Sequence, residues 1–166
     1  MENLATQLTK HARFPMLVCN YDFTGTPMEN KTIPYKVFRK GKLTIGILGV
    51  GIEGKGLIPD NLFGNTQYLD PVQKANETAA LLKKKEKCDM VICLSHLGNQ
   101  YKGFDKVSDE ILAKESENID LIIGGHTHTF LDEPLVYKNK KGDDVVVNQV
   151  GFAGLILGRL DFEFTK

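Results

Sequence analysis

The chain has 166 residues, enough for one domain with a hydrophobic core. Its apolar content of 42% and charged content of 25% exclude a disordered or fibrous protein. Lys and Arg together number 21, as do Asp and Glu, which argues against a surface built to bind a nucleic acid polymer or an anionic membrane. Three cysteines do not make a disulfide framework, and no apolar stretch reaches the roughly 18 residues of a membrane span.

The first half of the chain begins with an expected helix over residues 1–11, where Leu4 and Leu8 share a face. A short buried strand over 16–19 follows, and then a loop. Alternating residues over 35–40 and 43–50, joined by a Gly-Lys turn, predict a β-hairpin. The glycines between 49 and 56 lack the Gly-Lys-Ser/Thr ending of a phosphate loop, so we expect an ordinary loop there.

The middle of the chain alternates helices with buried strands. A helix is expected from residue 71 to about 87, and its apolar stripe comprises Val72, Ala75, Ala79 and Leu82. An apolar run over 90–94 predicts a buried strand. A second helix is expected over 107–114 with Ile111 and Leu112 facing inward, and a second buried strand over 119–123.

The last third of the chain is predicted to form strands. Residues 134–137 and 145–147 flank a Lys-Gly-Asp turn and predict an antiparallel pair, and the alternating segment 155–164 predicts one more strand. The whole chain, residues 1–166, is therefore expected to form a single α/β (α+β) domain, with helix–strand units followed by strands.

Three of the four histidines lie where the two buried strands of the middle segment end. His96 follows the first strand, and His126 and His128 follow the second. Open α/β sheets bind ligands at the carboxyl ends of their strands, and imidazoles there are candidate metal ligands. In an extended segment, side chains at i and i+2 point the same way, so His126 and His128 can face one point. A single histidine at such a place is more often structural, and His11 is expected to be a surface or capping residue.

These motifs resemble those of a known enzyme family. The stretch Ser-His-Leu-Gly at 95–98, followed by Gly-Gly-His-Thr-His at 124–128, is similar to the calcineurin-like metallophosphoesterases, in the branch of the bacterial 5′-nucleotidases. Residues 15–20, 148–151 and 157–160 support the resemblance more weakly. It implies a partial two-layered metallophosphoesterase β-sandwich flanked by helices, with the first strands missing.

The resemblance also implies a metal site. The family uses two divalent metal ions, Zn, Mn or similar, to activate a water for attack on a phosphate ester. By resemblance, His96 and His126 would bind one metal and His128 the other. The family's Asp-x-His, Gly-Asp and Gly-Asn-His-Glu/Asp elements do not occur in this sequence. We therefore expect metal binding by this chain alone to be weak or absent, and we assign it no catalytic residue.

Two functions remain open. The first is part of a dimetal phosphoester hydrolase, a 5′-nucleotidase or a cyclic-nucleotide phosphodiesterase of the same branch, acting on a nucleotide or another phosphate ester. The second is a non-catalytic binding or structural module.

The resemblance places the parent enzyme in the periplasm or at the cell surface, although the first residues do not form a signal peptide. Missing first strands would uncover apolar sheet surface, so a homo-oligomer is a further expectation.

Overall fold

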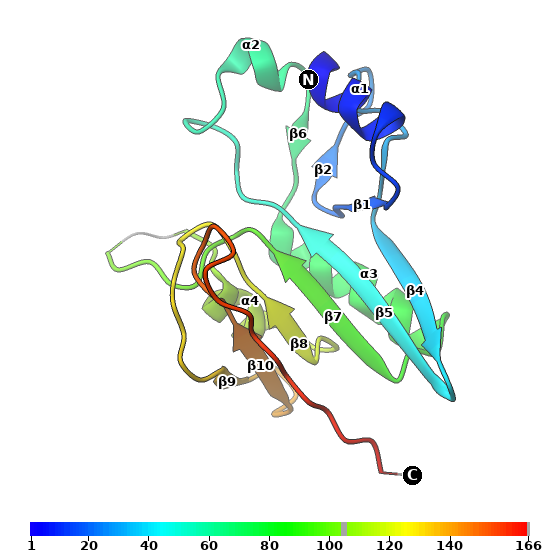
Figure 1. Ribbon diagram of the computed structural model, residues 1–166, viewed down its shortest axis with the longest axis vertical. Helices are drawn as coiled ribbons and strands as arrows, with labels where there is room; N and C mark the ends of the chain where they lie inside the picture. Colours follow the sequence, from blue (N-terminus) through cyan, green and yellow to red (C-terminus); the bar gives the residue numbers. More distant parts are fainter. Residues whose placement is uncertain (104–105, 166) are drawn as a thin grey trace.

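A six-stranded mixed sheet forms the centre of the computed structural model, which describes residues 1–103 and 106–165 (Figure 1). The strand order is β4-β5-β7-β8-β10-β9. The strands are β4 (Tyr35–Lys40), β5 (Leu43–Val50), β7 (Met90–Ser95), β8 (Leu121–Ile123), β9 (Leu135–Lys138) and β10 (Asp144–Asn148). The four central strands run parallel, and the edge strands β4 and β9 are antiparallel to their neighbours. Both predicted hairpins, β4–β5 and β9–β10, are confirmed.

Two helices, α3 (Pro71–Lys84) and α4 (Asp109–Glu115), cover the same face of this sheet, behind it in Figure 1. Alternate side chains of the strands point toward the helices, as the twofold repeat of a strand requires. The buried core consists of Leu48, Val50, Ala75, Ala79, Leu82, Cys88, Val91, Cys93, Leu97, Leu112, Ala113, Ile119, Ile122, Val145 and Val147. Three of the four residues of the predicted stripe on α3 are in this core, and Val72 packs against its edge.

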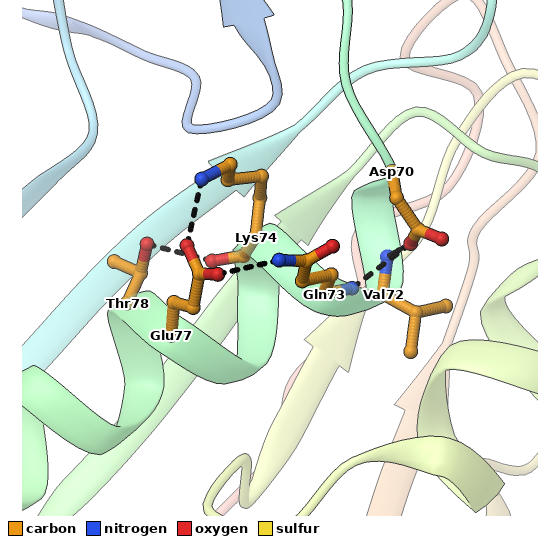
Figure 2. A network of polar contacts seen from close by, with 6 residues as sticks. All are labelled: Asp70, Val72, Gln73, Lys74, Glu77 and Thr78. Atoms are coloured by element: carbon orange, nitrogen blue, oxygen red, sulfur yellow. Dashed lines mark hydrogen bonds and ion pairs between the residues drawn. The ribbon is translucent and has the colours of Figure 1, made fainter.

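The start of α3 is fixed by side-chain hydrogen bonds (Figure 2). The carboxylate of Asp70 accepts the backbone N–H groups of Val72 and Gln73, each at 2.9 Å. These two donors have no partner within the helix, so Asp70 is an N-cap. One turn later, Lys74 Nζ and Glu77 Oε2 form an ion pair at 2.7 Å. The helix therefore begins where the sequence predicted, at the proline after Asp70.

Two details of the helices differ from the prediction. Helix α3 ends at Lys84 rather than near residue 87, because Lys87 adopts a left-handed conformation with φ of 56° and the chain turns there toward β7. In α4, Leu112 is buried as expected, but Ile111 is 38% exposed. The inward face of α4 instead consists of Asp109, Leu112 and Ala113, at spacing i, i+3 and i+4. An ionisable residue, Asp109, thus faces the core where the pattern had placed Ile111.

Short elements lie beyond the carboxyl ends of the parallel strands, at the top of Figure 1. They are α1 (Glu2–Lys10), β1 (Met16–Leu17), β2 (Tyr21–Asp22), β3 (Thr32–Ile33), α2 (Asp60–Phe63) and β6 (Gln67–Tyr68). Strand β1 pairs with β3, and β2 pairs with β6, each as a separate two-stranded sheet. The predicted strand over 16–19 is therefore shorter, half-buried and outside the main sheet. None of the described helices is long and apolar enough to cross a bilayer.

The sheet face opposite the helices is open in part. Residues 155–165 run across the front of this face (Figure 1) without forming a helix or strand. The predicted strand over 155–164 is therefore wrong: its alternation is real, but in the described structure it has no neighbouring strand with which to form a hydrogen-bond ladder. Leu157 is 94% exposed, and an apolar groove lies between this segment and Ile92 and Ile123 of the sheet.

Candidate functional site

The carboxyl ends of the parallel strands bring the sequence-predicted histidines to one edge of the sheet. His96 follows β7 directly, and the loop with His126 and His128 follows the adjacent strand β8. The imidazoles of His96 and His126 are neighbours, with ring centroids 5.2 Å apart and planes at 72°. The prediction that these two side chains, which follow separate strands, lie close together is therefore confirmed.

Glycine at position 125 allows this close approach. A Cβ added there would lie 3.1 Å from Nδ1 of His96, closer than side chains normally pack. Gly125 thus leaves room for the His96 ring beside the backbone of the second strand end. This is the role expected of a glycine where a chain passes close to another group.

His128 lies differently from the expectation. Both His126 and His128 have left-handed backbones, with φ of 69° and 54°. The argument from an extended segment is therefore wrong, since extended residues have negative φ. The ring of His128 stacks on Phe152, with centroids 5.0 Å apart and planes at 21°. The structure pairs His96 with His126 and turns His128 toward an aromatic neighbour.

The surroundings of His126 favour its neutral form. Partial burial lowers its pKa below the ordinary 6.5, and the nearby His96, His128 and Lys106 lower it further. At neutral pH the imidazole therefore keeps a free lone pair, as a metal ligand must. His11, by contrast, is an exposed residue at the end of α1, as predicted.

The described residues do not fit a complete two-metal centre. The calcineurin-like family that the histidine motifs resemble uses divalent metal ions. Within residues 1–103 and 106–165, no group of three or more His, Cys, Asp or Glu side chains is arranged to hold a metal ion. Two adjacent imidazoles supply at most half of a four-coordinate shell, and among the described residues no carboxylate completes a metal-binding group with them. No catalytic step through a metal follows from these residues alone.

A cavity of about 670 Å³ opens beside the histidine pair. It lies between the sheet edge and the short elements above it, and its walls are mainly apolar, including Met16, Leu17 and Val50. Tyr21, His96 and His126 are the polar side chains among its described lining residues. No Lys or Arg is among its described lining residues.

Buried polar side chains beneath the histidines were missed by the sequence analysis. Gln149, directly after β10, is 2% exposed and bonds to Gly125, Thr127 and Thr129. Asp109 of α4 is fully buried and accepts a hydrogen bond from Ser95. No local pattern marks such residues, although Asp109 stands at the i, i+3, i+4 spacing of core residues and could have been noticed there.

Burial has a strong effect on Asp109. It raises the pKa of this carboxyl from 3.8 to about 7, and the hydrogen bond from Ser95 offsets only part of the rise. A carboxylate in an apolar surrounding loses its hydration, so the neutral acid is favoured. Asp109 is thus protonated to a large extent at neutral pH, beneath the strand end that carries His96.

Comparison with known proteins places this arrangement in a family. The family model "Calcineurin-like phosphoesterase" matches residues 8–130. A 5′-nucleotidase of Vibrio cholerae is 34% identical over 173 aligned residues, which cover 92% of this chain and 31% of that protein. A 5′-nucleotidase of Vibrio parahaemolyticus is 31% identical, with 92% and 30% covered. The chain therefore spans about a third of the length of these relatives.

Solved structures agree with the sequence matches. The 5′-nucleotidase precursor from Thermus thermophilus has a TM-score of 0.71 and 29% identity, covering 88% of this chain and 29% of that one. The NAD nucleotidase of Haemophilus influenzae has the same TM-score at 23% identity, covering 89% and 30%, and shows the shared fold. Since the family model covers most of the chain, including His96 and His126, the protein belongs to the calcineurin-like phosphoesterase family.

Proposed function

We propose that this protein supplies the histidine-bearing part of a metal-dependent phosphoester hydrolase that acts on nucleotides, as a 5′-nucleotidase does. The observation that carries the proposal is the pair of imidazoles, His96 and His126, at adjacent strand ends with ring centroids 5.2 Å apart. The lowered pKa of His126 supports it, because a neutral imidazole is the ligand form. The 5′-nucleotidase relatives support the choice of substrate class.

In this proposal the histidines bind divalent ions such as Zn²⁺ or Mn²⁺, which imidazole suits. His96 and His126 take one ion, and His128 takes part in binding the other. A two-metal site needs further donors and a bridging carboxylate, which the described residues do not provide. The chain by itself is therefore expected to bind one ion weakly and to show little or no hydrolysis.

Calorimetric titration of the chain with Zn²⁺ tests the proposal. Weak binding of one ion is expected for the unaltered chain, and its loss is expected in His126→Ala. His11→Ala is the matched control, because His11 is exposed and lies at the end of α1. Equal binding by all three proteins, or no binding by the unaltered chain, would contradict the assignment of the metal site.

The alternative is a non-catalytic binding or structural module. It is favoured by the incomplete set of metal donors among the described residues and by the open sheet face. An assay of p-nitrophenyl phosphate with added Mn²⁺ can rule out the alternative, although the metal-site proposal itself predicts little or no turnover by the chain alone. Turnover by the chain, lost in His126→Ala, would exclude the alternative.

We further propose that two copies of the chain associate through the open sheet face. Leu94, Ile123 and Val136 are large apolar residues of the sheet that stay at least 40% exposed. The formal net charge is zero, so copies of the chain repel one another little. Light scattering after size-exclusion chromatography should show a dimer that dissociates on dilution, and a monomer at high concentration would contradict it.

For localisation, we propose that the intact enzyme is exported to the periplasm or cell surface. The Thermus thermophilus relative is described as a 5′-nucleotidase precursor, which is consistent with processing on export. Fractionation of cells that express the gene in its natural setting would test this, with periplasmic or surface recovery expected.

A further inference from the structure

The side chain of Gln149 spans the loop that carries His126 and His128. Its Nε2 donates to the carbonyl oxygen of Gly125 at 2.5 Å. Its Oε1 accepts from Thr127 Oγ1 at 3.0 Å and from the backbone N–H of Thr129. The three contacts fall immediately before, between and after the two histidines. One buried amide thus holds the loop on both sides of each imidazole.

This loop needs such support because its backbone is unfavourable for histidine. Each of His126 and His128 has a positive φ, which is unfavourable for a residue with a Cβ because the Cβ comes too close to the backbone. Strained residues persist where surrounding contacts fix them. The hydrogen bonds of Gln149 are those contacts on the sheet side. Without them, we expect the loop to relax and the two rings to change direction.

Asp109 supports the backbone around His96, at the end of β7, as Gln149 supports the loop after β8. Its Oδ1 accepts from Ser95 Oγ at 2.5 Å, and its backbone N–H donates to the carbonyl of Gly98 at 2.8 Å. Ser95 Oγ in turn accepts the backbone N–H of Leu97 at 3.1 Å. These partners precede and follow His96. The first residue of α4 thus fixes the backbone on both sides of that histidine.

The two supports meet beneath Gly124. A Cβ added at this glycine would lie 2.2 Å from Oδ2 of Asp109 and 3.2 Å from Nε2 of Gln149. Oδ2 of Asp109 is buried and has no hydrogen-bond partner in the described structure. The two strand ends are also joined directly, since the backbone N–H of Asn99 donates to Thr127 Oγ1 at 3.0 Å. The backbone segments that carry His96 and His126 are therefore held by one connected set of buried polar groups.

We infer that Gln149 and Asp109 are positioning residues, which set the directions of His126 and His96 so that the two imidazoles lie next to each other in an edge-to-face arrangement. The geometric part of this inference concerns the metal-free chain. Its consequence for metal binding rests on the proposed function. Side chains that orient metal-binding histidines typically contribute about 10-fold to 100-fold in metal affinity.

Gln149→Met tests the inference, because methionine keeps the volume of glutamine and removes all three hydrogen bonds. The readout is the nuclear Overhauser effect between the rings of His96 and His126 in the metal-free chain, which we expect to be lost. Asn139→Leu is the matched control. Asn139 is 7% exposed and its Oδ1 accepts two backbone N–H groups, but it lies in the β9–β10 turn. This control should lose stability and keep the ring contact.

A second, milder variant keeps the inference testable if the Gln149→Met protein does not fold. Thr127→Val removes one of the three hydrogen bonds of Gln149, together with the bonds of Thr127 Oγ1 to the backbone N–H of Asn99 and to Thr129 Oγ1, so a weakened ring contact is expected in a folded chain. For the other support, Asp109→Asn retains an acceptor for Ser95 and should keep the ring contact, whereas Asp109→Leu should lose it. An unchanged ring contact in folded Gln149→Met and Asp109→Leu would overturn the inference.

Zn²⁺ titration of the same proteins separates this inference from the proposed function. Binding to the unaltered chain that weakens about 10-fold or more in Gln149→Met, and not in Asn139→Leu, supports both. If Zn²⁺ binds none of the proteins, the proposed metal site fails, and the ring contact still decides the inference. If Zn²⁺ binds Gln149→Met as tightly as the unaltered chain, the inference fails and the metal site stands.

Discussion

Replacement of Asp109 by asparagine should remove a pH-dependent part of the free energy of unfolding. The folded chain holds the Asp109 proton up to a pKa of about 7, whereas the unfolded chain releases it near 3.8. The folded state thus binds more protons between these values, and the stabilisation is present below about pH 4 and lost as the pH rises through 7. A difference of about 3 units corresponds to about 4 kcal/mol, of which about 3 kcal/mol is lost between pH 5 and pH 8.

Urea denaturation followed by circular dichroism, at pH 5 and pH 8, measures this effect. Since asparagine does not titrate, the free energy of unfolding of the unaltered chain should fall relative to Asp109→Asn by about 3 kcal/mol from pH 5 to pH 8. Other titrating groups are common to both proteins and cancel in the difference. Asp144→Asn, an exposed carboxylate paired with Lys138, is the control and should show no such change. Parallel pH profiles for the unaltered chain and Asp109→Asn would refute the reasoning.

Three further predictions concern the site, the open face and helix α3. Gly125→Ala places a methyl group 3.1 Å from Nδ1 of His96, so the His96 ring resonances should shift in NMR spectra; unchanged resonances would contradict the close approach. Ile123→Lys puts a charge on the open sheet face, so light scattering should show the dimer dissociating to monomer, and a persistent dimer would exclude this face as the interface. Asp70→Ala removes the N-cap of α3 and should lower the free energy of unfolding by about 1 kcal/mol in urea titrations, whereas no change would show that the cap is dispensable.

The parallel strands and the proximity of the two histidines could be predicted because local sequence patterns indicate the strands and the helix between them. The apolar runs that became β7 and β8 are bounded by polar and glycine residues, and a helical stripe separates the first of them from β5. Parallel strands place their carboxyl ends at one edge, so His96 and His126 had to lie near each other. Here the order of elements brings the two histidines to the same edge of the sheet.

The conformation of the histidine loop could not be predicted in the same way. An extended segment would have aligned His126 with His128, but both have left-handed backbones that depend on contacts with Gln149. Gln149 stands 23 residues from His126 in the sequence and follows a different strand. Such long-range hydrogen bonds leave no trace in a local pattern. The buried Asp109 was missed for a different reason, because charged residues are almost always exposed.

At the terminal segment, a local pattern predicted a strand that the structure does not contain. Residues 155–164 alternate apolar and polar as a strand does, yet they form none in the structure. Alternation reports that a segment has two different faces, but a strand also needs a partner for its backbone groups. Alternation alone was therefore not sufficient to predict a strand.

The central claim is that His96 and His126 together hold a divalent metal ion. Anomalous diffraction at the zinc absorption edge, from crystals of the chain grown with Zn²⁺, tests it most directly. The account predicts an anomalous peak between the two imidazoles, about 2.1 Å from a nitrogen of each ring. A chain saturated with Zn²⁺ whose anomalous peaks all lie away from these two rings would contradict it.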